Sequence, residues 1–170
     1  MIKVIRVDYR LIHGQVAISW VRKAGVDYLV VADDHAATDA LVKMTMKLAQ
    51  PSGVGMDILP SEKVIALTKK GRYDRKKVLV ICGNMKEAAN LAIGLREKED
   101  IKSVVVGNVR AKEHSLHYNA AVDMNADELS DALRITQAGI NVNLQLFPDS
   151  DPEVLSEDRI LTDLQKIEEE

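Results

Sequence analysis

Three residues suited to phosphate chemistry lie close together near the start of the chain. In the stretch VIRVDYRLIHGQVAISW, residues 4–20, Arg6 and Arg10 precede His13. A neutral imidazole can attack phosphorus, and a guanidinium binds phosphate through a planar fork of donors and stays charged at any cellular pH. These residue types at this spacing indicate a histidine that acquires a phosphoryl group beside two permanent cations.

The neighbouring elements place this cluster at a strand-to-helix turn. A β-branched run predicts a strand over 3–7, and a helix is expected over 14–24, closed by Gly25. His13 then stands at the helix start, where the free N–H groups of Gly14 and Gln15 favour an anion. Phosphoryl transfer depends mainly on positioning and on neutralising charge, which this arrangement supplies.

Spacing alone leaves a second interpretation of the cluster equally open. His13 would then hydrogen-bond a backbone carbonyl, while Arg6 and Arg10 pair with Asp8 and other surface acids. Lone histidines in loops are common, so the spacing does not decide between the two interpretations.

The rest of the chain alternates between strand and helix patterns. Further strands are expected at 28–32, 55–59, 77–81, 103–107 and 141–147, with a short one within 116–124. Further helices are expected at 39–49, at 61–70 with Ser61 as its cap, at 84–98, and at 125–138 with Asn125 as its cap. This alternation predicts a three-layer α/β/α fold with a mostly parallel central sheet. Ligands bind such sheets at the carboxyl ends of the strands, so the active loop is expected there, after the first strand.

The last segment differs from the alternating body because it is rich in acidic residues. A helix is expected at about 157–168, with one apolar stripe formed by Ile160, Leu161, Leu164 and Ile167. We interpret it as a helix docked on the body; an interaction tail and a solvated acidic end are the alternatives.

Composition limits the class of protein. With 170 residues, the chain is expected to form a single domain over 1–170. Its net charge of -3 and the lack of a basic run interleaved with aromatic residues argue against nucleic acid as a partner. One cysteine, Cys82, gives no internal disulfide, and no stretch reads as a signal peptide or a membrane span. The sequence therefore predicts a cytoplasmic protein that stays outside the membrane.

The stretch around His13 closely resembles the phosphohistidine segment of a known family: the IIB components of the bacterial phosphotransferase (PTS) sugar transporters of the mannose/fructose/sorbose type. The resemblance continues in GVDYLVVADDHAATD (25–39), QPSGVGMDIL (50–59) and INVNLQLFPDS (140–150). It covers roughly residues 1–150, so it is a match over a whole domain.

The resemblance implies a phosphotransferase that carries a phosphoryl group during sugar uptake. His13 would receive the group from phosphohistidine on a IIA component and pass it to a sugar of the mannose, fructose, sorbose or amino-sugar class. Arg6 and Arg10 would stabilise the group in both transfers. The sugar would be held by membrane IIC and IID subunits, and no metal or organic cofactor is implied. Docking of IIA predicts an exposed surface around His13, with Arg10, Leu11 and Arg22 contributing.

The chain departs from the family pattern at two places. Many relatives carry two acids before the second arginine, whereas this chain has Asp8 followed by Tyr9, so Asp8 is kept as an accessory, orienting residue. Many relatives carry a Gly-Gly-Met turn where this chain has Gly107, Asn108 and Val109, and no role is assigned to that loop.

Other residues are weaker candidates for chemistry. Asp33 and Asp34, in a loop expected at the same sheet edge, either hydrogen-bond an imidazole or arginine of the site or only end a strand, and His35 beside them is expected to be an exposed loop residue. His114 and His117 lack an acid or cysteine that would complete a metal site. Cys82 follows the fourth strand without arginines around it, which favours a buried, inert thiol.

Two other functions stay open at this point. A regulatory module that accepts phosphate and passes it to no sugar would have the same sequence features. A nucleotide-using transferase is suggested only faintly, by IHGQ together with KMTMK at 43–47, because no Walker loop or dinucleotide fingerprint is present.

Overall fold

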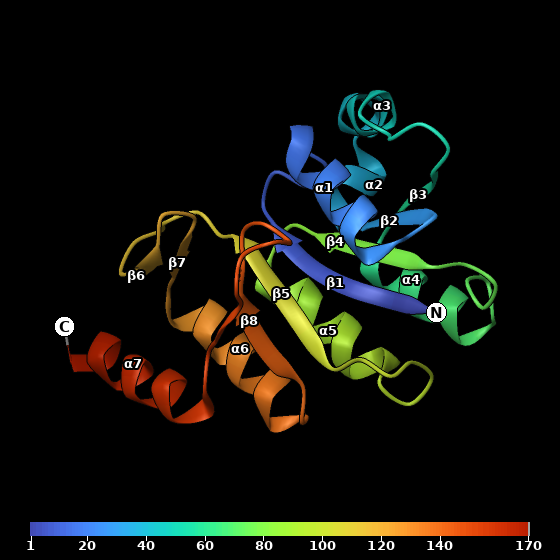
Figure 1. The fold of residues 1–170 in the computed structure, drawn as a ribbon. Coiled ribbons are helices and arrows are strands. Elements are labelled where there is room, and N and C mark those ends of the chain that lie inside the picture. Colours follow the sequence, from blue (N-terminus) through green and yellow to red (C-terminus); the bar gives the residue numbers. More distant parts are fainter. Residues whose placement is uncertain (170) are drawn as a thin grey trace.

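A twisted seven-stranded sheet forms the centre of the molecule in the computed structural model, which describes residues 1–169 (Figure 1). Its strand order is β3-β2-β4-β1-β5-β8-β9, and every pairing is parallel except that of β9 with β8. The strands are β1 (Ile2–Asp8), β2 (Tyr28–Ala32), β3 (Gly55–Leu59), β4 (Val78–Cys82), β5 (Ser103–Asn108), β8 (Asn141–Leu144) and β9 (Glu153–Val154).

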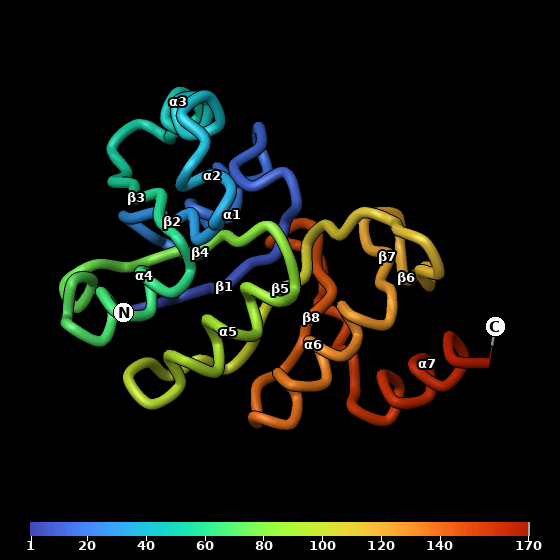
Figure 2. Tube along the Cα trace, turned by 180° about the vertical axis from the view of Figure 1, so that it is seen from behind, coloured from blue at the N-terminus to red at the C-terminus, as the bar shows by residue number. Residues whose placement is uncertain are grey.

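Helices cover both faces of the sheet, so the predicted three-layer α/β fold is confirmed. One face carries α1 (Gly14–Ala24), α2 (Asp34–Thr38) and α3 (Ala40–Leu48), and the other carries α4 (Ser61–Lys69), α5 (Met85–Leu95) and α6 (Ala126–Gln137) (Figures 1 and 2). The helix α7 (Glu157–Glu169) packs against α6. Among the helices within residues 1–169, none is both long and apolar enough to be a membrane span.

Two aliphatic cores hold the layers together, one on each face. Under α1, the buried side chains of Trp20 and Val21 pack on Leu29, Ile81 and Val105 of the sheet. The larger core under α5 and α6 is built mainly from valine, leucine, isoleucine and alanine. Burial of this apolar surface is the dominant favourable contribution to folding.

Because β1 lies in the middle of the sheet, the loop that follows it lies between the ends of two neighbouring strands. β1 pairs with β4 on one side and β5 on the other, and the chain leaves β1 toward α1 but leaves β4 toward α5, on the opposite face. Open α/β sheets bind ligands at the carboxyl ends of two adjacent strands whose following helices lie on opposite faces of the sheet, the topological switch point.

Several elements differ from the sequence-based expectations. The region 116–124 forms a two-stranded hairpin, β6 (Leu116–Asn119) and β7 (Val122–Met124), and not one strand. Two short elements, α2 and β9, were not expected. β8 ends at Leu144 and α5 ends at Leu95, both earlier than predicted.

The predicted helix caps have mixed outcomes. Asn125 caps α6 as expected, in a reciprocal capping box with Glu128. Ser61 does not cap α4; Pro60 occupies that position, and the N–H of Ser61 donates to Asp34 Oδ1 at 3.1 Å.

Candidate active site

The loop between β1 and α1 is anchored so that His13 is exposed. Leu11 and Ile12 are buried, and Leu11 adopts a left-handed φ of 59° that turns the chain toward α1. The burial of Leu11 contradicts its expected place on the exposed docking surface. His13 is the N-cap residue of α1, in extended conformation, and its side chain makes no capping hydrogen bond. The imidazole is therefore accessible at a helix N-terminus.

The first turn of α1 offers unsatisfied backbone donors beside this imidazole. Gly14 and Gln15 are exposed, and the first turn contains no acidic residue. The first N–H groups of a helix have no partner within the helix, and the helix dipole makes this end positive. The predicted positions of His13, Gly14 and Gln15 thus coincide with a site that attracts an anion.

Asp8 joins the two arginines. Its Oδ2 accepts hydrogen bonds from Arg6 Nη2 at 3.3 Å and from Arg10 Nη2 at 3.1 Å, while its Oδ1 accepts from Arg10 Nε at 3.1 Å. The backbone N–H of Arg10 also donates to Oδ1 at 3.1 Å. One buried carboxylate therefore orients both guanidinium groups.

Arg6 is enclosed by the protein. Only 2% of its surface is exposed. Its Nη1 donates to the Gln145 carbonyl at 3.0 Å, and the guanidinium carbon lies 5.1 Å from the centre of the Trp20 ring. Burial lowers the pKa of Arg6, and the charge of Asp8 opposes that shift. Direct binding of phosphate by Arg6 stays a prediction; in this conformation its contacts are with Asp8, Gln145 and Trp20.

Arg10 keeps its guanidinium near the surface. Its side chain is 26% exposed, and the hydrogen bonds that it donates to Asp8 raise its pKa. Bidentate pairing of this kind fixes the plane of a guanidinium. Arg10 is therefore the arginine that can present donors to a group on His13.

The other predicted accessory residues have structural partners. Asp33 caps α2 by accepting the N–H of Ala36 at 2.7 Å, and Asp34 binds the first residue of α4. A Cβ on Gly83 would contact both Asp33 and Leu11, so Asp33 adjoins the active loop. The part played by these two acids in the reaction remains a prediction.

Residues that sequence reasoning missed hold the site together. Trp20 donates from Nε1 to the Leu146 carbonyl at 3.2 Å, and Gln145 supplies the acceptor for Arg6. Glu87, buried near Cys82 and Asp33, accepts the N–H of Asp34 at 3.1 Å. Only the amphipathic pattern of α1, which places Trp20 toward the sheet, could have indicated one of these contacts.

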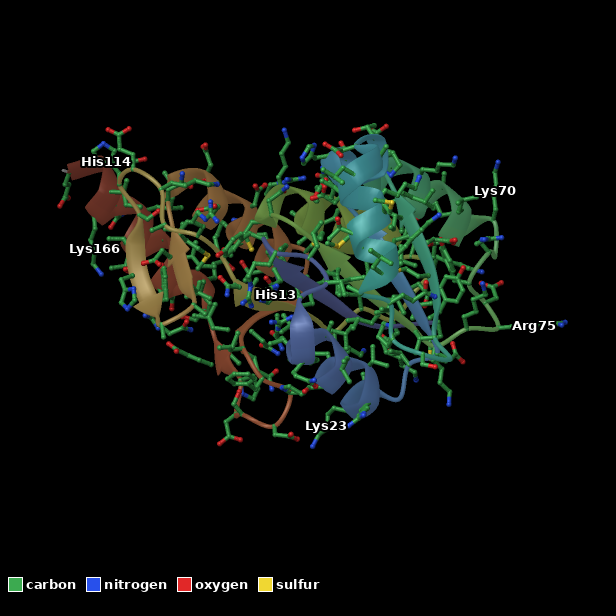
Figure 3. The ribbon with its side chains drawn as sticks, turned by 90° about the horizontal axis from the view of Figure 1, so that it is seen from above. His13, Lys23, Lys70, Arg75, His114 and Lys166 are labelled. Atoms are coloured by element: carbon green, nitrogen blue, oxygen red, sulfur yellow. The ribbon has the colours of Figure 1, made fainter. Side chains whose placement is uncertain are left out.

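The remaining candidates lie away from His13 or are inert. Cys82 is buried, as expected, and burial raises the pKa of its thiol. His35 is exposed on α2. His114, seen from above in Figure 3, lies far to one side of His13. His117 Nδ1 lies 2.9 Å from Asp123 Oδ1, a pairing within the hairpin.

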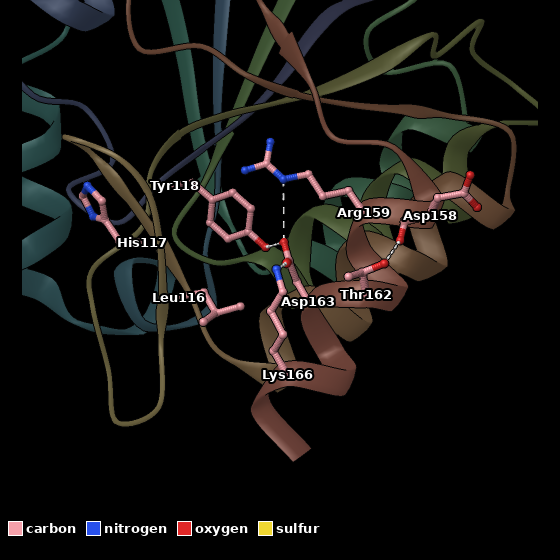
Figure 4. A pocket seen from close by; sticks show the side chains of 8 residues that line it. All are labelled: Leu116, His117, Tyr118, Asp158, Arg159, Thr162, Asp163 and Lys166. Carbon is pink, nitrogen blue, oxygen red and sulfur yellow. Dashed lines mark hydrogen bonds and ion pairs between the residues drawn. The ribbon is translucent and has the colours of Figure 1, made fainter. Parts of the chain in front are cut away.

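A separate cavity of about 430 Å³ lies between the hairpin and α7 (Figure 4). Asp163 accepts the hydroxyl of Tyr118 at 2.8 Å and an ammonium proton of Lys166 at 2.6 Å, and it lies 3.7 Å from Arg159 Nε. Asp163 belongs to α7 and Tyr118 belongs to the hairpin, so their hydrogen bond in the cavity wall joins these two elements.

Comparisons with known proteins identify relatives whose similarity extends over nearly all of this chain. The model of the PTS system sorbose subfamily IIB component matches residues 2–168. The N-acetylgalactosamine-specific phosphotransferase enzyme IIB component 1 of Escherichia coli is 33% identical over 144 residues, covering 84% of this chain and 89% of that protein. A probable phosphotransferase enzyme IIB component of Streptococcus pyogenes is 40% identical over 109 residues, which are 64% of this chain and 65% of that protein.

A solved structure supports the same relationship. The crystal structure of the PTS system N-acetylgalactosamine-specific IIB component 1 from Escherichia coli superposes with a TM-score of 0.83 at 30% sequence identity, covering 92% of this chain and 100% of that one. PTS IIB components accept phosphate from a IIA component and transfer it to sugar. The chain belongs to the sorbose subfamily of PTS IIB components, and it is a phosphotransferase of a sugar transport system.

Proposed function

We propose that His13 is the residue of this phosphotransferase that carries the phosphoryl group, with residues 1–170 acting as one IIB domain on the cytoplasmic side of the membrane. The observation that carries the proposal is an exposed imidazole at the start of α1, on a first turn without acids and three residues after the oriented Arg10. Helix N-termini and arginines are both suited to phosphoryl oxygens.

The two transfers balance without further reactants. In the first, a nitrogen of His13 attacks phosphorus as the P–N bond of phosphohistidine on a IIA component breaks. In the second, a sugar hydroxyl oxygen attacks phosphorus, the P–N bond to His13 breaks, and the hydroxyl proton passes to the imidazole of His13, which becomes neutral again. Arg10 and the N–H groups of Gly14 and Gln15 hold the phosphoryl oxygens, while Arg6 acts mainly through Asp8.

The proposed partners are a IIA phosphodonor and membrane IIC and IID subunits that hold the sugar. The sugars to test are mannose, fructose, sorbose and amino sugars. The similarity to an N-acetylgalactosamine-specific IIB component supports testing amino sugars before the others.

We infer that the IIA donor docks partly on α3. Three apolar side chains at helical spacing are exposed there: Leu41 by 68%, Met44 by 55% and Leu48 by 82%. Helix α3 and His13 are both visible from the same side of the molecule (Figure 3). A donor must cover His13 to reach it, and exposed apolar side chains near such a site supply burial for a partner.

Phosphorylation by phosphoenolpyruvate, the general phosphotransferase proteins and a IIA component of this subfamily tests the proposal. We expect one acid-labile, alkali-stable phosphohistidine, absent in His13→Ala and formed slowly in Arg10→Ala. His35→Ala, which removes another exposed histidine, is the matched control and should label normally. Normal labelling of His13→Ala would contradict the proposal.

A second measurement separates sugar transfer from a purely regulatory role. Phosphorylated protein is mixed with membranes carrying IIC and IID and with each sugar. Formation of a sugar phosphate together with loss of phosphohistidine is expected; stable phosphohistidine with all the sugars would favour a regulatory phosphoacceptor.

A further inference from the structure

Asn108, the last residue of β5, lies directly beside the active loop. It is paired in register with Asp8, and its carbonyl accepts the N–H of Tyr9 at 3.1 Å. The main chain at this position is therefore part of the wall next to Arg10.

The Asn108 side chain bridges Arg10 and the hairpin. In the amide orientation that satisfies both of its ends, Oδ1 accepts from Arg10 Nη2 at 3.1 Å and Nδ2 donates to the Ala121 carbonyl at 3.1 Å. The opposite orientation would turn the NH₂ group toward the Arg10 donor and the oxygen toward the Ala121 carbonyl. The carbonyl of Ala121 thus determines which end of the amide faces Arg10.

The position of Ala121 is itself fixed. Its carbonyl also accepts the N–H of Val109 at 2.9 Å, and the Val109 carbonyl accepts the N–H of Asp123 at 3.0 Å. The hydroxyl of Tyr118 ties the other strand of the hairpin to α7. Asn108 therefore connects Arg10 to a segment held at several points.

The donors of Arg10 can be accounted for in this arrangement. A guanidinium carries five N–H groups. Nε and Nη2 donate to Asp8, and Nη2 also donates to Asn108. Within residues 1–169 no acceptor contacts Nη1, so its two N–H groups are available to another molecule.

We propose that Asn108 is a positioning residue for phosphoryl transfer: its Oδ1 accepts from Arg10 Nη2 while its Nδ2 donates to the Ala121 carbonyl, and this fixed pairing directs Nη1 toward the phosphoryl group on His13. This inference rests on the proposed function of His13 and adds a residue to it. Asn108 does not contact the phosphoryl group; it acts through Arg10, together with Asp8.

The test measures initial rates of His13 phosphorylation with two donors, a phosphorylated IIA component and the small donor phosphoramidate, which transfers its phosphoryl group and releases ammonia. For Asn108→Ala we expect rates about tenfold lower or more with both donors, because a hydrogen bond to a charged group is lost. Rates are referred to the folded fraction, determined from thermal unfolding of each variant.

Asn141→Ala is the matched control. Asn141 is exposed at the start of β8 and pairs with Ser103, at the other end of β5 from Asn108, so this change removes an asparagine of the same sheet without a contact to Arg10 or Ala121. Its rates should stay within about twofold of the wild-type rates, as expected for a site outside the interacting group.

The double variant distinguishes positioning from a general structural effect. If Asn108 acts through Arg10, then Arg10→Ala with Asn108→Ala is labelled as slowly as Arg10→Ala alone. Wild-type rates in Asn108→Ala, or an equal further loss in the Arg10→Ala background, would overturn the inference. Either result would leave His13 as the acceptor as long as His13→Ala is unlabelled, so the failures of the two proposals can be told apart.

Discussion

Replacing Asp8 with asparagine tests the arrangement around His13 most directly, because one carboxylate holds both arginines. Asp8 and Arg6 are each 2% exposed. The carboxylate accepts one hydrogen bond from Arg6 and three from Arg10, including its backbone N–H. The isosteric amide removes the negative charge and turns an NH₂ group toward donors.

The expected cost is dominated by Arg6. Removing one partner of a buried ion pair costs about 3–5 kcal/mol, because the other charge stays buried without compensation. Arg10 is 26% exposed, and exposed pairs contribute only about 0–1 kcal/mol. In Asp8→Asn, Arg6 still donates to the Gln145 carbonyl and still contacts the face of the Trp20 ring, which reduces the loss of stability. We therefore expect Asp8→Asn to lower the free energy of unfolding by about 3 kcal/mol.

Urea denaturation gives this quantity, and a second variant isolates the buried charge. In Arg6→Met with Asp8→Asn the buried cation is removed as well, so this protein should be more stable than Asp8→Asn alone. His13 labelling in Asp8→Asn should fall about tenfold or more, since Arg10 loses its bidentate partner. A loss of stability below about 1 kcal/mol, or no gain from the second substitution, would show that the buried Arg6 charge does not depend on Asp8.

Three further changes test other parts of the molecule. In Gly107→Ala, the new Cβ would overlap the Arg6 guanidinium, so we expect a loss of about 3 kcal/mol in urea unfolding, and a much smaller loss when the same change is made in the Arg6→Met protein, measured against Arg6→Met alone. Burial raises the pKa of Glu87 above its ordinary 4.5, so above pH 4.5 the folded chain retains a proton that the unfolded chain has lost, and stability falls as the pH rises. Replacing Glu87 with glutamine removes this titration, so Glu87→Gln should raise Tm more at about pH 8 than at about pH 5. An equal change in Tm at both pH values would contradict this. Leu48→Glu should slow labelling of His13 by the IIA component but not by phosphoramidate, and equal slowing with both donors would argue against docking on α3.

The central strands and main helices could be predicted because their signals are local. Apolar runs and capping residues lie within the elements themselves, and β2 and β3 match their predicted bounds. The short elements depend on distant partners. β9 has two residues and exists through pairing with β8, while α2 is one turn and a half held by its Asp33 cap and by Glu87. Neither element is long enough to show the hydrophobic periodicity from which helices and strands are predicted.

The position of His13 could be predicted for the same local reason, whereas the environment of Arg6 could not. A turn followed by an amphipathic helix indicates an N-terminus without any tertiary information. Arginine is almost never fully buried without a partner, so composition favours an exposed Arg6. Gly107, Trp20 and Gln145 enclose it, and two of these lie about a hundred residues or more along the chain.

Burial gives the two arginines different tasks although their side chains are the same. Arg6 fixes the Asp8 carboxylate from the protein side, and Asp8 with Asn108 then fixes Arg10 at the surface. Two guanidinium groups share one carboxylate, so the cluster keeps one positive charge in excess beside the N-terminus of α1. Because hydrogen bonds within the protein orient this charge before a donor arrives, the proposed transfer to His13 would require little reorganisation, and preorganised charge of this kind is usually the largest contribution to catalysis.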